Sequence, residues 1–273
     1  MRTKKAFDLK KIQRGNKALE VDRNLVEPLA KAYLERMSLD DKIEQLHGSK
    51  SSGDMGTEKG LYWSGENLEQ GIPPLKMVDG PRGLRSGLAT AFPVPMARGA
   101  SFDPALEKRV GMAIGNEVAA VGGNVLLAPT INLLRHPGWG RAQETYSEDP
   151  FHMGLMGLAF VCGAQNFVLA SPKHFALNNL EITRFEVSSE IEERALHEVY
   201  LPHFKRSILE GGAASIMSAY NKVNGTYCGE NHDLLEKILR ADWGFEGFVE
   251  SDWLLGTRST ASAINSGMDI EMP

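Results

Sequence analysis

Two segments of this chain place ionisable side chains directly after apolar runs. Lys173 and His174 follow one such run, and Asp252 follows another and precedes Trp253. Burying an ammonium, an imidazole or a carboxylate is costly unless a ligand or a counter-charge is close. We therefore take these residues as candidate site residues, with Asp252 as a base or nucleophile beside an aromatic side chain.

Further polar side chains recur after other apolar runs. They are Asp79, Arg82 and Arg85; Asn132, Arg135, Arg141 and Glu144; Asn178, Asn179, Glu181 and Arg184; Ser218, Tyr220 and Asn221; and Asp269 and Glu271. A single charged residue after a strand is usually a cap or a surface ion pair, and we favour that interpretation for Arg141, Glu144 and Glu148. Gathered around one concave mouth, however, carboxylates, cations and an aromatic ring suit a polyhydroxylated ligand. Paired hydrogen bonds recognise its hydroxyl groups, and the ring stacks on the C–H face of a sugar.

Motifs for other chemistries are absent from the sequence. The chain has no G-x-S-x-G, G-x-G-x-x-G or P-loop pattern. His197, Glu198 and His203 lack the H-E-x-x-H spacing of a zinc site. The sequence therefore predicts neither a metal nor a cofactor.

Apolar runs alternate with helical patterns along most of the chain. We expect helices at 26–36, 38–46 (capped by Ser38), 104–120, 151–164, 190–209, 234–239 and 260–265, and strands at 75–78, 124–127, 167–171, 214–218, 247–251 and 268–271. This alternation is typical of an α/β fold with a parallel sheet. Polar residues at many different strand ends favour a TIM-type (β/α)8 barrel over an open doubly wound sheet. Because 79–92 is too short and glycine-rich for a crossover helix, we expect the first unit to be collapsed or antiparallel.

Composition limits the class of partner. The chain has 273 residues, is 42% hydrophobic and carries a net charge of −5, which disfavours nucleic acid and anionic membranes as main partners. Two cysteines cannot form a disulfide framework, so we expect free thiols and a cytoplasmic protein. We assign 1–37 to a leader and first helix and 38–273 to the barrel. A solvated leader is favoured over a transit segment for the basic stretch 1–17.

In order along the chain, a set of motifs resembles glycoside hydrolase family 3, in its β-glucosidase-like members. The motifs are Met77-Val-Asp79-Gly-Pro-Arg-Gly, Asn132-Leu-Leu-Arg135, Gly140-Arg141 with Tyr146-Ser-Glu-Asp-Pro150, Lys173-His174-Phe, Ser218-Ala-Tyr220-Asn-Lys-Val-Asn-Gly225 and Ser251-Asp252-Trp253. The resemblance implies a retaining double displacement on a β-linked glucoside or related sugar. It implies Asp252 as nucleophile, Asp79 as the carboxylate that grips the far hydroxyls, Tyr220 near the nucleophile and Trp253 as an aromatic wall. It also implies a set of hydroxyl-binding residues: Arg85, Arg135, Lys173, His174 and Arg184.

The chain departs from the family pattern in three ways. The family takes its general acid/base from a domain downstream of the barrel, whereas this chain ends at Pro273 on the expected last strand. One family branch carries a histidine acid in a Lys-His-Phe-Pro-Gly-His run, but here Ala-Leu-Asn-Asn follows Lys-His-Phe. Glu250 stands where the family usually has an apolar residue, and a carboxylate there should raise the pKa of the nucleophile unless a basic group pairs with it.

These departures leave the acid unassigned and keep other functions open. Glu271 and Glu144 are candidate acids, although a structural ion pair is favoured for both. We expect the final helix of the barrel to be missing, and the uncovered wall to associate with another copy or a second chain. The alternative function is a carbohydrate-binding barrel without efficient turnover, and a purely structural fragment would bind no sugar.

Overall fold

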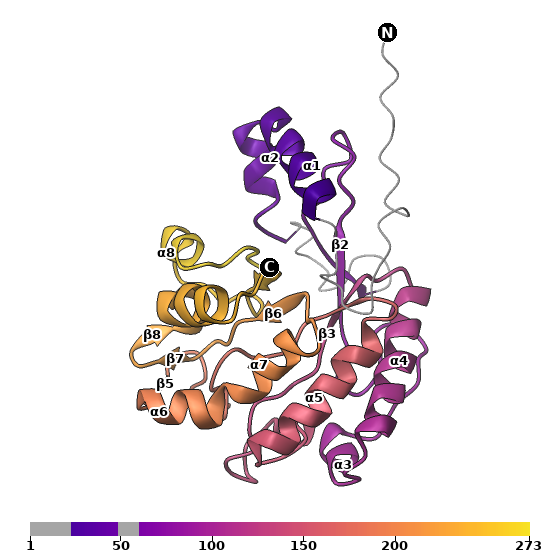
Figure 1. The fold of residues 1–273 in the computed structure, drawn as a ribbon, viewed down its shortest axis with the longest axis vertical. Helices are drawn as coiled ribbons and strands as arrows, with labels where there is room; N and C mark the ends of the chain where they lie inside the picture. Colours follow the sequence, from indigo (N-terminus) through magenta and orange to yellow (C-terminus); the bar gives the residue numbers. More distant parts are fainter. Residues whose placement is uncertain (1–22, 49–59) are drawn as a thin grey trace.

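The computed structural model describes residues 23–48 and 60–273 (Figure 1). Its helical elements are α1 (Arg23–Arg36), α2 (Leu39–Glu44), α3 (Pro95–Gly99), α4 (Pro104–Ala120), η3 (Ala142–Glu144), α5 (Pro150–Ala164), α6 (Glu193–Ala195), η4 (Leu196–Tyr200), α7 (Pro202–Leu209), η5 (Cys228–Glu230), η6 (Asp233–Asp242) and α8 (Thr260–Asn265). Its strands are β1 (Tyr62–Ser64), β2 (Leu75–Asp79), β3 (Val125–Leu127), β4 (Leu169–Ala170), β5 (Ser188–Ser189), β6 (Ser215–Met217), β7 (Lys222–Val223), β8 (Thr226–Tyr227) and β9 (Phe248–Glu250). The expected leader at 1–17 lies outside the described residues.

Strand pairings and single-residue bridges together close a ring. The strands β2, β3 and β4 pair in parallel, and so do β6 and β9. The remaining links are the pairs Phe175–Ser218, Glu250–Ile270, His47–Glu271 and Gly48–Ser64, followed by the antiparallel pairing of β1 with β2. This closed arrangement is the predicted TIM-type barrel, with α4, α5 and α7 on its outer side (Figure 1).

Most predicted elements occur within a few residues of their expected bounds. Ser38 caps α2 through a capping box with Asp41. The segment 268–271 makes only single-residue bridges at Ile270 and Glu271. The expected antiparallel pairing is present, but it joins β2 to the preceding strand β1. The next connection, from β2 to β3, is an ordinary parallel crossover that contains α4. The short sheet β5-β7-β8 was not predicted.

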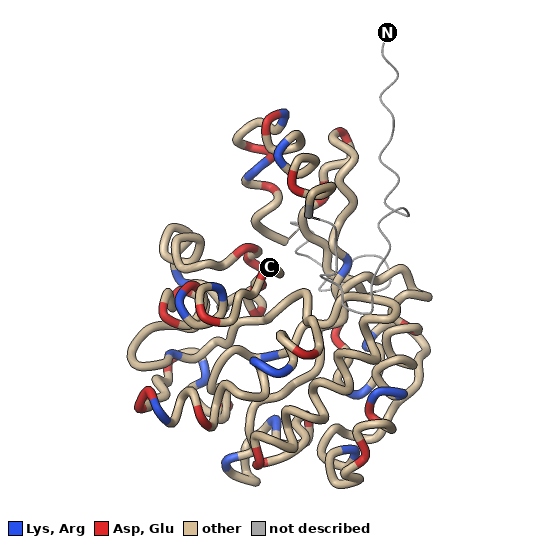
Figure 2. The backbone as a smooth tube through the Cα atoms, in the orientation of Figure 1, with Lys and Arg blue, Asp and Glu red and all other residues tan. Residues whose placement is uncertain are grey.

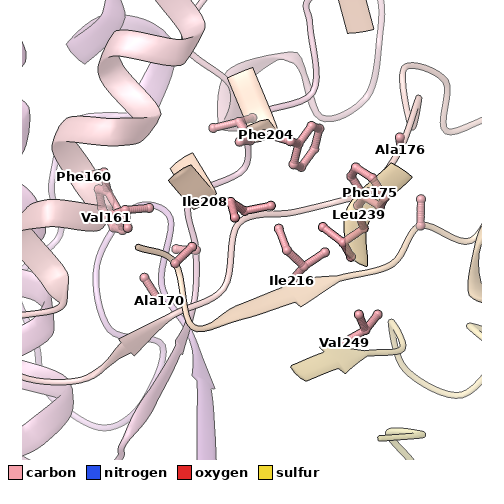
Figure 3. Close-up of a cluster of buried hydrophobic side chains, with 14 of the residues drawn as sticks. Phe160, Val161, Ala170, Phe175, Ala176, Phe204, Ile208, Ile216, Leu239 and Val249 are labelled. Carbon is pink, nitrogen blue, oxygen red and sulfur yellow. The ribbon is translucent and has the colours of Figure 1, made fainter. Parts of the chain in front are cut away.

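One apolar cluster lies between the barrel strands and the outer helices. Figure 3 shows Phe160, Phe175, Phe204, Ile216 and Val249 in this cluster, all fully buried. The helices α4 and α5 approach closely because both carry glycines at the contact. A Cβ added to either of these, at position 111 or 163, would lie within 2.5 Å of a carbonyl oxygen of the other helix.

A second cluster fills the interior of the barrel. Its members are Met77, Val125, Leu127, Met217, Ile270 and Met272, with Leu75, Leu169 and Phe248 packed against them. Since side chains alternate along a strand, the next inward positions are Asp79 on β2, Ser171 and Lys173 after β4, and Glu250 and Asp252 on and after β9. The barrel interior therefore carries polar side chains above an apolar base.

Lys and Arg positions are interspersed with Asp and Glu positions along the backbone (Figure 2). Within residues 23–48 and 60–273, no helix has the length and apolar character needed to cross a bilayer. Both cysteines are free thiols, Cys228 buried and Cys162 partly buried.

Candidate active site

A cavity of about 400 Å³ opens at the carboxyl ends of the barrel strands. Of the nine residues to which the family resemblance assigns a role, all but Arg135 line it: Asp79, Arg85, Lys173, His174, Arg184, Tyr220, Asp252 and Trp253. These side chains come from β2 and from the segments that follow β4, β6 and β9. The barrel thus brings residues that are up to 174 positions apart in sequence to one cavity, from Asp79 to Trp253.

Asp252 is a buried carboxylate with one oxygen that no described residue binds. Its side chain is 13% exposed, and Oδ2 lies 3.5 Å from His174 Nε2 without a hydrogen bond. Burial raises the pKa of Asp252 to about 6, although Lys173, Arg141 and Tyr220 favour its charged form. Asp252 is therefore mostly ionised at neutral pH, with Oδ2 free to attack an electrophile.

His174 is held as a neutral imidazole. Asn132 Oδ1 accepts hydrogen bonds from the backbone N–H of His174 at 2.8 Å and from Nδ1 at 3.2 Å. The imidazole proton is therefore on Nδ1, and the unprotonated Nε2 accepts a hydrogen bond from Arg141 Nη1 at 2.9 Å. Burial and the nearby arginines and lysine lower the pKa of His174 well below its ordinary value. His174 consequently serves as a hydrogen-bonding group rather than as a cation.

Asp79 is the second carboxylate of the cavity, and it is neutralised by two cations. Lys173 Nζ lies 2.7 Å from Oδ1, and Arg85 Nη1 lies 3.3 Å from Oδ2. Burial raises the pKa of Asp79, but Lys173, Arg85 and Arg141 outweigh it and hold the pKa below its ordinary value. An ionised carboxylate in this setting accepts hydrogen bonds from ligand hydroxyl groups.

Arg135 lies outside the cavity, and Arg141 occupies it instead. Arg135 is exposed, with its guanidinium 5.7 Å from the centre of the Tyr200 ring. Arg141 lines the cavity and also binds Glu144 through Nη2 at 2.8 Å. The expected ion pair of Arg141 is thus present, but Arg141 lines the cavity and does not lie on the outer surface. The signal was present in the sequence, because Arg141 belongs to one of the six motifs.

Two aromatic residues form one wall of the cavity. The ring of Tyr62 meets Trp253 edge-on, with ring centres 4.9 Å apart at 77°. The Tyr220 hydroxyl donates to the Trp253 carbonyl at 2.7 Å and fixes the backbone beside Asp252. Sequence reasoning missed Tyr62 because β1 is only three residues long and carries no recognisable strand pattern.

A second cavity of about 660 Å³ adjoins the first. It shares Asp79, Arg85, Arg141 and Lys173 with the first cavity and extends along the loop 80–94. Among the described residues, no three His, Cys, Asp or Glu side chains are grouped as a metal site would need.

This geometry can be compared with known proteins. The sequence matches the family model described as "Glycosyl hydrolase family 3 N terminal domain" over residues 56–273. The chain belongs to glycoside hydrolase family 3. A β-glucosidase of Rhizobium radiobacter is 42% identical over 249 residues, and β-glucosidase B of Emericella nidulans is 40% identical over 250. These matches cover 88% and 89% of this chain but only 29% and 28% of the relatives.

Solved structures of the family have the same barrel. β-Glucosidase 3B of Thermotoga neapolitana in complex with α-D-glucose superposes with a TM-score of 0.86 at 37% identity, over 90% of this chain and 36% of that one. The β-glucosidase of Kluyveromyces marxianus in complex with glucose gives 0.83 at 35% identity, over 89% and 29%. This family 3 chain therefore spans about a third of the length of these relatives.

Proposed function

We propose that the cavity is the glucose-binding subsite of a retaining β-glucosidase and that Asp252 is its nucleophile. The observation that carries the proposal is the free Oδ2 of Asp252 in a polar cavity opposite Asp79 and beside Trp253. Relatives named β-glucosidases, two of them solved with glucose, support this substrate class.

The reaction follows from the positions of these groups. Asp252 Oδ2 attacks the anomeric carbon, and the bond between that carbon and the leaving oxygen breaks with its electron pair. A proton supplied to the leaving oxygen completes the first step, and a glycosyl ester of Asp252 remains. Water then attacks the same carbon, releases glucose and restores the carboxylate. The raised pKa of Asp252 does not prevent this, since it remains below neutrality.

The remaining cavity residues bind and orient the sugar. Asp79 accepts from ligand hydroxyl groups, while Lys173, Arg85 and Arg184 donate to them. Neutral His174, held by Asn132, keeps the Asp252 side of the cavity free of an additional cation. Arg141 joins this group in the position that we had expected for Arg135.

The proton donor of the first step is, in our proposal, outside the described barrel residues. A general acid needs a raised pKa, but Arg141 holds the pKa of Glu144 below its ordinary value against the opposing effect of burial. Glu271 accepts a hydrogen bond from the Thr257 hydroxyl and lines neither cavity. A second polypeptide segment, in the same chain or in a partner, would supply the acid at the cavity mouth.

Covalent trapping tests the nucleophile. A 2-deoxy-2-fluoro-β-glucoside with a good leaving group needs little acid assistance, so it should label the full 273-residue chain on the peptide that contains Asp252. Asp252→Asn should abolish labelling, whereas the matched surface variant Asp242→Asn should keep it. Labelling of Asp252→Asn at the wild-type level would refute the assignment.

The alternative is a carbohydrate-binding barrel without turnover. This alternative is favoured because the 400 Å³ cavity has only two carboxylates among its described lining residues, Asp252 and Asp79. Asp79 is already bound to two cations, so neither is free to act as the general acid. Glucose binding by calorimetry without any covalent labelling would identify this function. Absence of both would indicate a structural role.

A further inference from the structure

Glu250 is a fully buried carboxyl group one layer beneath the candidate site. It lies on β9 two residues before Asp252, so both side chains point into the barrel. Ser171 stands in the same relation to Lys173 at the end of β4. Glu250 and Ser171 therefore form a polar layer between the cavity residues above and the apolar interior cluster below.

Three side chains of this layer contact one another in a ring. Ser171 Oγ lies 2.5 Å from Glu250 Oε1, Ser215 Oγ lies 2.9 Å from Glu250 Oε2, and the two serine oxygens are 3.2 Å apart. Three contacts need three hydrogens, but two hydroxyl groups supply only two. The third hydrogen must come from the carboxyl group. The ring is therefore complete only when Glu250 is protonated.

Among the described residues, no positively charged group is in direct contact with Glu250. Lys173 and Asp252 are the charged groups in the layer above, and the Lys173 ammonium is engaged by Asp79 at 2.7 Å. The facing strand β6 contributes Ser215 and Met217, which are uncharged. The segment 269–271 turns Ile270 toward Glu250, while Asp269 binds Arg240 and Glu271 binds Thr257.

We propose that Glu250 acts as a neutral acid that positions Asp252 and Lys173, and that its ionisation limits activity at alkaline pH. This inference rests on the proposed function. Loss of the proton to solvent leaves the two serine oxygens facing each other without a hydrogen. It also places a negative charge beneath Lys173, where it competes with Asp79 for the ammonium group.

The pH at which this occurs lies near neutrality. Burial raises the pKa of Glu250 to about 7, although the two serines and Lys173 favour the charged form. Asp252 loses its proton at about 6, so the two ionisations bracket a narrow pH range. Activity should rise with the first ionisation and fall with the second.

A burst experiment isolates this second ionisation. With 2,4-dinitrophenyl β-glucoside the leaving group needs no acid, so the rate of the dinitrophenolate burst reports only formation of the glycosyl ester. For the wild-type chain we expect that rate to fall about sixfold between its maximum near about pH 6.5 and about pH 8. Glu250→Gln keeps the shape and cannot ionise, so its rate should rise with the ionisation of Asp252 and stay level above about pH 7. The exposed Glu190→Gln serves as a matched control and should follow the wild type.

The pH dependence of stability provides a readout that is independent of catalysis. A carboxyl group whose pKa is raised on folding stabilises the fold fully below its unfolded value of about 4.5, and this stability is lost as pH rises through about 7. The unfolding midpoint of the wild type in urea should fall over this range, and that of Glu250→Gln should fall less. If Glu250→Gln does not fold, Glu250→Met provides the same comparison with an apolar side chain.

Each outcome decides the inference. Equal pH profiles for wild type and Glu250→Gln in the burst rate would overturn the positioning role, whatever the stability shows. A chain that shows the stability difference but no burst would instead refute the proposed glycosidase function and leave the buried proton in place. Equal stability profiles and equal rates would overturn the inference entirely.

Discussion

Lys173 Nζ lies 2.7 Å from Asp79 Oδ1 and joins the ends of β4 and β2 across the mouth of the barrel. The ammonium group is nearly buried and the carboxylate is 27% exposed. The pair therefore pre-orients two side chains that we propose bind the sugar, and neither position has to bury an isolated charge.

Replacing Lys173 should reverse the effect of pH on the stability that Asp79 contributes. In the wild type the pKa of Asp79 lies below its unfolded value of 3.8, so its contribution is present above that pH and is lost as pH falls through the folded pKa. In Lys173→Met burial prevails, the folded pKa rises above 3.8, and stability is lost as pH increases instead. Urea unfolding at several pH values between about pH 3 and about pH 7 shows whether the free energy of unfolding rises or falls with pH. An unchanged slope would show that Arg85 and Arg141 keep Asp79 ionised without Lys173.

The fall of the burst rate at acid pH should report the protonation of Asp252. Its folded pKa of about 6 means that the nucleophile gains its charge as pH rises through that value. The burst rate with 2,4-dinitrophenyl β-glucoside should therefore increase about tenfold per pH unit below about pH 5 and reach its maximum near about pH 6.5, before the fall that we assign to Glu250. A rate that stays constant down to about pH 4 would show that Asp252 has an ordinary pKa.

Sequence reasoning found the residues whose position depends on local pattern. Asp79, Lys173, His174 and Asp252 each follow an apolar run, and barrel topology carries such positions to one mouth. Sequence reasoning could not tell which of Arg135 and Arg141 reaches the cavity, because both lie in one connection after β3. Only the path of that connection, which folds Arg141 back onto His174, shows which arginine reaches the cavity.

A second limit concerns very short elements. The strand β1 has three residues, and its pairing with β2 is set by contacts across ten intervening positions, between Ser64 and Leu75. Tyr62 consequently has no local signal that would place it beside Trp253. Likewise, the proton count of the Glu250–Ser171–Ser215 ring needs three strands at known register, although the sequence alone identified Glu250 as unusual.

Tyr62 should support Trp253 through its ring rather than its hydroxyl group. An edge-to-face aromatic pair contributes about 0.5–1.5 kcal/mol beyond area burial, which corresponds to a few-fold to about tenfold in affinity. Tyr62→Ala should weaken glucose binding by that factor, whereas Tyr62→Phe should bind as the wild type does. Calorimetric titration with glucose distinguishes the two. Equal weakening in both variants would assign the effect to the hydroxyl group instead.

Arg141 and Arg135 form a matched pair that tests which arginine belongs to the site. Both are arginines in the connection after β3, but only Arg141 donates to His174 Nε2 and favours the charged form of Asp252. Arg141→Met should therefore raise the pH at which the nucleophile ionises and lower the burst rate at about pH 6 by at least several-fold. It also leaves His174 Nε2 without its donor and Glu144 without its partner, so some loss of stability is expected.

Arg135→Met removes only an exposed contact with Tyr200, worth at most about 1 kcal/mol, and should leave the pH profile of the burst rate unchanged. If instead Arg135→Met shifted the acid limb and Arg141→Met did not, the hydroxyl-binding role would return to Arg135, and the connection after β3 would have to adopt another path when sugar binds.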